Sequence, residues 1–107
     1  MSPSSGAEGG CPPQHWEDSV IRVLDIVNTR GLHARASAKF VQTVEKYEAE
    51  VRVTRGGETV GGTSIMGLMM LAAGPGTSIK IEASGPQATE VMDALERLVR
   101  GRFGEED

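Results

Sequence analysis

The sequence predicts an α+β fold, an open-faced β-sandwich in which three helices cover one face of a four-stranded antiparallel sheet. Two observations predict it. Segments in which apolar and polar residues alternate, typical of half-buried strands, occur among segments with one apolar stripe at helical spacing, in the order β-α-β-β-α-β-α. Because each strong helical segment has a single apolar stripe, the helices are expected to lie on one side of the sheet.

The first two elements are predicted within residues 20–47. Val20 to Val27 is dense in β-branched residues and predicts a strand, with Leu24 and Ile26 on its core face. Residues 28–31 contain Asn and Gly and are typical of a turn. Residues 34–47 then predict a helix with the apolar stripe Ala34, Ala38, Val41 and Val44.

The second half of the domain begins with a predicted hairpin. Val51 and Val53 alternate with polar residues, residues 55–58 suit a turn, and residues 59–61 form a short partner strand. A short apolar helix follows over residues 64–70, with Ser64 as its N-cap. Residues 77–83 predict the last strand, and the final helix has the apolar stripe Ala88, Val91, Met92, Leu95, Leu98 and Val99.

Composition divides the 107 residues into one domain with two extensions. Residues 1–18 are rich in Ser, Gly and Pro, so we expect a flexible arm that buries too little apolar surface to become ordered. The domain is expected to span residues 19–101, and residues 102–107 are expected to form an acidic tail. The single Cys11 and the absence of a signal peptide predict the cytoplasm. No apolar run is long enough for a membrane span.

Candidate chemistry concentrates at His33, where the predicted turn ends and the first helix begins. The first turn of a helix has free N–H groups and a partial positive charge, which stabilise an anion. Arg35 adds a cation with several donors suited to phosphate oxygens. A neutral imidazole nitrogen is a nucleophile, so these residues together suit acceptance of a phosphoryl group.

Other interpretations of His33 stay open on the residues alone. A lone histidine in a loop is more often a solvated or capping residue, and a His-x-Arg pair is frequent by chance. A metal site is disfavoured because no second His or Cys lies nearby in the sequence. The sequence also lacks the G-x-x-x-x-G-K-[ST] loop that would bind ATP as a direct donor, and no cofactor is predicted.

Two segments resemble the HPr family, the histidine-containing phosphocarriers of the phosphoenolpyruvate-dependent phosphotransferase system. Residues 31–40, GLHARASAKF, resemble its active-site signature, and residues 63–71, TSIMGLMML, resemble its regulatory serine segment. The similarity runs from about Val20 to Val99 and implies the same open-faced sandwich. It implies that His33 is phosphorylated through Nδ1, that Arg35 assists, and that Ser64 is the position phosphorylated by a dedicated serine kinase, with a matching phosphatase.

The resemblance also implies partners. Phosphorylated enzyme I would be the donor and enzyme IIA proteins the acceptors, in a sugar or nitrogen-related branch, for a carrier without enzymatic turnover of its own. Two positions depart from the family pattern: Ala36 replaces the usual Pro after the active-site Arg, and Thr63 replaces the frequent Lys before the serine. Ala favours the helix and restores an N–H, so we expect altered stiffness and retained chemistry. Thr63 puts recognition by the serine kinase in doubt.

The apolar run that follows Ser64 predicts a docking surface. Leu68 and Leu71 are expected to point inward, which leaves an exposed patch of Ile65, Met66 and Met69 suited to several partners. Burial of all these residues in a core poor in aromatics is the alternative, just as plain N-capping is the alternative for Ser64. The predicted positive rim of this surface is Arg30, Arg35 and Lys39.

The sequence is also compatible with functions other than that of a phosphocarrier. The same fold would suit a regulatory binding module that uses phosphorylation as a signal without onward transfer. A small nucleic-acid-binding domain is disfavoured by the formal net charge of −4 and by the lack of aromatic platforms. We expect a monomer, because such a protein must offer one face to successive partners.

Overall fold

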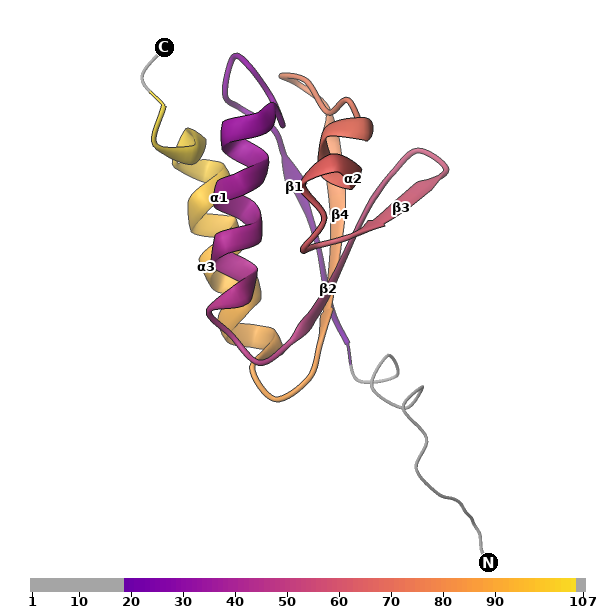
Figure 1. The fold of residues 1–107 in the computed structure, drawn as a ribbon, viewed down its shortest axis with the longest axis vertical. Helices are drawn as coiled ribbons and strands as arrows, with labels where there is room; N and C mark the ends of the chain where they lie inside the picture. Colours follow the sequence, from indigo (N-terminus) through magenta and orange to yellow (C-terminus); the bar gives the residue numbers. More distant parts are fainter. Residues whose placement is uncertain (1–18, 106–107) are drawn as a thin grey trace, which may run out of the picture.

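The computed structural model describes residues 19–105, and predictions that fall on residues 1–18 and 106–107, Cys11 among them, lie outside this range. The elements follow the predicted order β-α-β-β-α-β-α, with a short 3-10 helix, η2 (Arg102–Gly104), after the last α-helix. Figure 1 shows the strands crossing the molecule behind and beside the helices.

The sheet consists of four antiparallel strands in the order β1-β4-β2-β3. Their bounds are β1 (Val20–Asp25), β2 (Glu50–Arg55), β3 (Glu58–Gly61) and β4 (Ser78–Ser84). The first strand ends two residues before the predicted Val27, because its pairing with β4 stops where Asp25 meets Ser78. The chain leaves the sheet there and begins the loop that carries His33.

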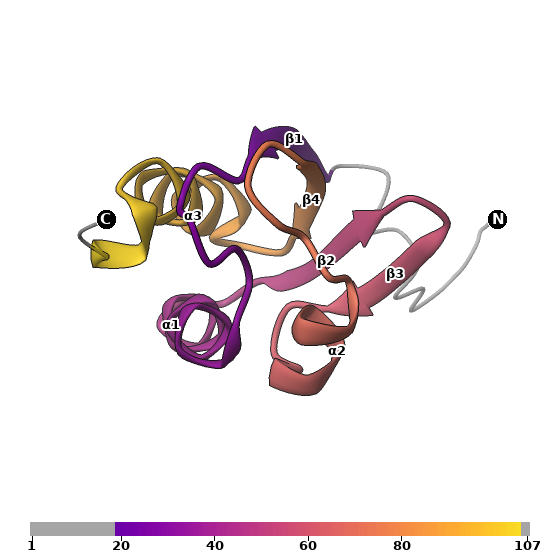
Figure 2. The same cartoon turned by 90° about the horizontal axis from the view of Figure 1, so that it is seen from above.

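Three α-helices cover one face of this sheet: α1 (Ala34–Glu45), α2 (Ile65–Met70) and α3 (Ala88–Arg100). Seen from above in Figure 2, the helices lie together on one side, and no helix of residues 19–105 covers the other. The predicted open-faced sandwich is therefore confirmed. The start of α1, α2 and the end of α3 gather at one end of the molecule (Figure 1).

The core lies between the helices and the sheet. Leu24 and Ile26 are buried as predicted, and α3 buries the expected stripe apart from Leu98, which is half-buried. On the open face, Ile21 and Val23 of β1 are exposed.

The buried face of α1 differs from the predicted stripe. Val41 and Val44 are buried, but Ala34 is exposed and Ala38 is half-buried. The large Phe40 is fully buried, and the residues three and four positions before it, Ser37 and Ala36, are buried with it. The rotation of the helix follows its largest apolar side chain, because burying Phe40 gains far more than burying an alanine methyl group.

Candidate functional site

His33 is the N-cap of α1, with an extended backbone (φ −79°, ψ −176°). Its carbonyl oxygen accepts the first helical hydrogen bond from the Ser37 N–H at 2.8 Å, and its own N–H donates to the Gly31 carbonyl at 2.9 Å. The imidazole forms no capping hydrogen bond to the helix. His33 therefore starts the helix with its backbone alone, and its ring is left for other interactions.

The loop before His33 is held against the loop before β4. The Leu32 N–H donates to the Ala73 carbonyl at 3.0 Å, and the Leu32 side chain is buried. Gly31 has φ +65°, and a Cβ added to it would lie only 2.2 Å from the Ala73 oxygen. Glycine is required here on two counts, since its conformation is left-handed and the two backbones approach closely. This contact fixes where the chain enters α1 and so where His33 sits.

The first turn of α1 provides an environment for an anion. The N–H groups of Ala34, Arg35 and Ala36 precede the first N–H bonded within the helix, and no acidic residue lies in this turn. The Arg35 side chain is exposed and makes no hydrogen bond or ion pair within residues 19–105. Ala36 is completely buried, and unlike a proline it contributes an N–H to this group. A negatively charged group beside His33 would therefore meet uncompensated donors and a helix dipole.

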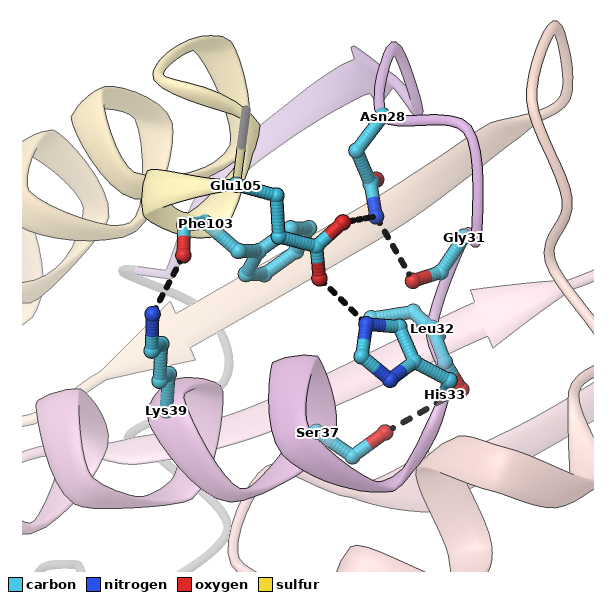
Figure 3. Close-up of polar contacts among 8 residues, drawn as sticks. All are labelled: Asn28, Gly31, Leu32, His33, Ser37, Lys39, Phe103 and Glu105. Atoms are coloured by element: carbon cyan, nitrogen blue, oxygen red, sulfur yellow. Dashed lines mark hydrogen bonds and ion pairs between the residues drawn. The ribbon is translucent and has the colours of Figure 1, made fainter. Parts of the chain in front are cut away.

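The C-terminal segment brings Glu105 to His33, a residue of the site that was not predicted from the sequence. The Nε2 atom of His33 contacts Oε2 of Glu105, 72 residues later, while Asn28 Nδ2 donates to Glu105 Oε1 at 3.0 Å and to the Gly31 carbonyl at 2.9 Å. In Figure 3 the carboxylate lies over one edge of the imidazole, and Nδ1 points away from it. The side chain of His33 stays 24% exposed. Nε2 is therefore held by the Glu105 carboxylate, and Nδ1 points away from that carboxylate.

The other residues selected from the sequence fall in two groups. Arg30 is exposed in the loop before His33, whereas Lys39 is half-buried and donates to the Phe103 carbonyl at 2.6 Å. Ser64 caps α2, and its Oγ accepts from the Gly67 N–H at 3.0 Å. The structure thus gives Lys39 and Ser64 structural contacts, beside any role they have toward partners.

The exposed side of α2 forms an apolar patch. Leu68 and Leu71 are buried as predicted, so the remaining side chains face outward. We call these the α2 patch, and they are Ile65, Met66, Met69 and Met70, with exposed fractions of 40%, 69%, 39% and 69%. Met70 extends the patch expected from the sequence. The patch lies on the helix beside α1, at the end of the molecule where α1 begins (Figure 1).

Two further findings limit the kinds of site. Within residues 19–105, no group of three or more His, Cys, Asp or Glu side chains is arranged to hold a metal ion. Across the same described residues, the helices are all too short or too polar to cross a membrane.

The fold and the site match one protein family. A family model described as the phosphorylation site of the HPr component of the phosphotransferase system (PTS) matches residues 20–101. This match covers the sheet, all three α-helices and the loop that carries His33. The architecture and the matched segment together define a small phosphocarrier protein.

Individual relatives agree. The chain is 52% identical over 82 residues to the phosphocarrier protein HPr of Neisseria meningitidis serogroup A, covering 77% of this chain and 92% of that protein. It is 50% identical over 84 residues to HPr of Cupriavidus necator, covering 78% and 94%. Among solved structures, HPr-C-His of Thermoanaerobacter tengcongensis aligns with a TM-score of 0.78 at 38% identity, covering 82% of this chain and 99% of that one. The chain belongs to the HPr family of the phosphotransferase system.

Proposed function

We propose that the protein accepts a phosphoryl group on Nδ1 of His33 from phosphorylated enzyme I and transfers it to enzyme IIA proteins. Phosphoenolpyruvate would be the original source. The observation that carries the proposal is the position of the ring: His33 starts α1, its Nε2 is held by Glu105, and Nδ1 points away from that contact (Figure 3). Family membership supports the general role, and the geometry supports this nitrogen.

The proposed chemistry is a displacement at phosphorus. The Nδ1 lone pair forms the new N–P bond while the bond between phosphorus and the donor breaks and its electrons leave with the donor. The first-turn N–H groups of α1 and the Arg35 guanidinium would stabilise the phosphoryl oxygens. In-line alignment requires both proteins of a complex, so we expect no turnover by this protein alone.

The partner surface is proposed to combine charge and apolar contact. Arg30 and Arg35 are exposed beside His33, and the α2 patch offers flexible methionine side chains that adapt to more than one partner. We propose that a cytoplasmic monomer uses this one end of the molecule for enzyme I and enzyme IIA in turn.

Regulation through Ser64 is proposed on its position. A phosphate on this exposed N-cap would sit at the start of α2, where negative charge is locally favourable, so the domain should stay folded. Its effect would be to place charge beside Ile65 and Met66 of the α2 patch. Thr63 stands before Ser64, so recognition by a serine kinase has to be measured directly.

The experiment is phosphoryl transfer with purified components. Incubation with enzyme I and phosphoenolpyruvate should add one acid-labile phosphate to the wild-type protein and to Ser64→Ala, and none to His33→Ala. Unchanged labelling of His33→Ala would overturn the proposal. A second stage adds enzyme IIA: transfer supports a relay, whereas a phosphorylated protein that passes nothing on would favour a regulatory module.

A further inference from the structure

The chain after α3 reverses direction and returns to the start of α1. Arg102, Phe103 and Gly104 all have left-handed backbones, with φ of 59°, 55° and 76°. Two of them are not glycine, so this turn is costly unless its surroundings compensate. Phe103 is 1% exposed within the core, and its carbonyl accepts the Lys39 hydrogen bond. These two contacts hold the reversal in place and bring Glu105 to His33.

The carboxylate of Glu105 is held from two sides. Oε2 contacts His33 Nε2, and Oε1 accepts from Asn28 Nδ2 at 3.0 Å. Asn28 is fully buried, and the same amide donates to the Gly31 carbonyl, so its own position is fixed by the loop before His33. The side chain of Glu105 is only 13% exposed. The position of this carboxylate is therefore fixed by its neighbours, whereas the two long side chains of a surface ion pair stay mobile.

A carboxylate only accepts hydrogen bonds when ionised, so the nitrogen that faces it must carry the proton. A neutral imidazole has one protonated nitrogen, and the hydrogen bond made by one nitrogen sets the state of the other. With the proton on Nε2, the lone pair lies on Nδ1. Attack through Nδ1 then leaves the ring positively charged, with its Nε2–H still directed at the carboxylate. A buried Asp does the same for the histidine of a serine-protease triad.

We propose that Glu105 is a positioning residue for phosphoryl transfer, which rests on the function proposed above. Its carboxylate keeps neutral His33 in the Nε2–H form, with the Nδ1 lone pair available, and stabilises the cationic ring produced when the N–P bond forms. When the phosphoryl group leaves, the N–P bond breaks, its electrons return to Nδ1, and the proton stays on Nε2. Asn28 acts through Glu105 by fixing the carboxylate.

The test separates the geometry of Glu105 from its charge. In Glu105→Gln an amide oxygen still accepts from Nε2, whereas Glu105→Ala removes both the acceptor and the charge. Glu58→Ala is the matched control, because Glu58 is an exposed residue of the β2–β3 hairpin whose side chain makes no hydrogen bond or ion pair inside the described range. Thermal unfolding of each variant establishes that the domain is folded.

The first measurement uses nitrogen-15 NMR of the unphosphorylated imidazole and needs no partner protein. Wild type and Glu58→Ala should show a protonated Nε2 whose proton exchanges slowly with water, Glu105→Gln should retain it, and Glu105→Ala should lose it. The second measurement is single-turnover acceptance from phosphorylated enzyme I. Both Glu105 variants should be slower on the order of tenfold, because both lose the carboxylate charge that stabilises the cationic ring.

Two results would overturn the role of Glu105: identical imidazole spectra in wild type and Glu105→Ala, or acceptance by both variants at or above the wild-type rate. The latter would identify the carboxylate as an obstruction. If wild-type protein accepts no phosphoryl group, the proposed function fails, whatever the spectra show. If wild type accepts normally and the Glu105 variants are unaffected, only the inference on Glu105 fails.

Discussion

Replacing Gly31 with Ala would disturb the loop that carries His33. The loss in the free energy of unfolding has two parts, one from the backbone conformation and one from a broken hydrogen bond. The residue has φ +65°, which costs a residue with a Cβ about 1–2 kcal/mol. The new Cβ would also lie 2.2 Å from the Ala73 oxygen and 2.9 Å from the Gly74 Cα, so the two loops must separate. Separation breaks the hydrogen bond from Leu32 to Ala73, which contributes about 1 kcal/mol. We expect a total destabilisation of about 2–3 kcal/mol.

Gly56→Ala is the matched control for this substitution. Gly56 has nearly the same backbone angle, φ +63°, but a Cβ added there meets nothing within 4 Å. Both substitutions reduce the entropy of the unfolded chain equally, so that effect cancels in the comparison. Urea unfolding should therefore show Gly31→Ala to be less stable than Gly56→Ala by at least about 1 kcal/mol. Acceptance from enzyme I should fall only for Gly31→Ala. Equal stability of the two variants would refute the argument that the close approach of the backbones fixes the site.

Three further predictions concern other contacts of the same end of the molecule. Ser64→Ala should lower the free energy of unfolding by about 1 kcal/mol while Ser64→Asp retains the N-cap, which thermal unfolding would measure; equal losses would contradict a capping role. Lys39→Met should release the turn at Phe103, seen as faster amide exchange at residues 104 and 105, and unchanged exchange would contradict the anchoring. Met66→Lys should weaken transfer from enzyme I without changing stability, whereas Val23→Lys, at a 63% exposed position on the open face, should change neither; equal transfer by both would argue against docking on α2.

The fold was predictable because its strands and its last helix have regular apolar spacing. Ile79 and Ile81 alternate with charged residues, and the face they predict is the face that is buried. The stripe predicted for α1 was right at Val41 and Val44 but wrong in the first turns of the helix, where four of the first five residues are small and alanine contributes little to a choice of face. Only the position of Phe40 indicates the observed rotation of α1, because burial of Phe40 also buries Ala36 and Ser37 on the same face.

The candidate site was predictable only in its local part. His33 and Arg35 lie two positions apart, so a turn followed by a helix was enough to bring them together. Glu105 could not be placed beside them, because its position depends on left-handed backbones at Arg102 and Phe103, which no local preference favours. The interpretation of residues 102–107 as an acidic tail rested on composition, which contains no signal for the burial of Phe103.

The return of the chain to His33 has a practical consequence for work on this protein. Because Glu105 is reached through a turn of fixed length after α3, adding or removing one residue between Gly101 and Glu105 would carry the carboxylate off the ring. We therefore expect purification tags, fluorophores and fusion partners attached behind Glu105 to disturb its contact with His33, and phosphoryl transfer should be measured without them. β1 starts at the far end of the molecule from α2 (Figure 1), so probes belong before residue 19.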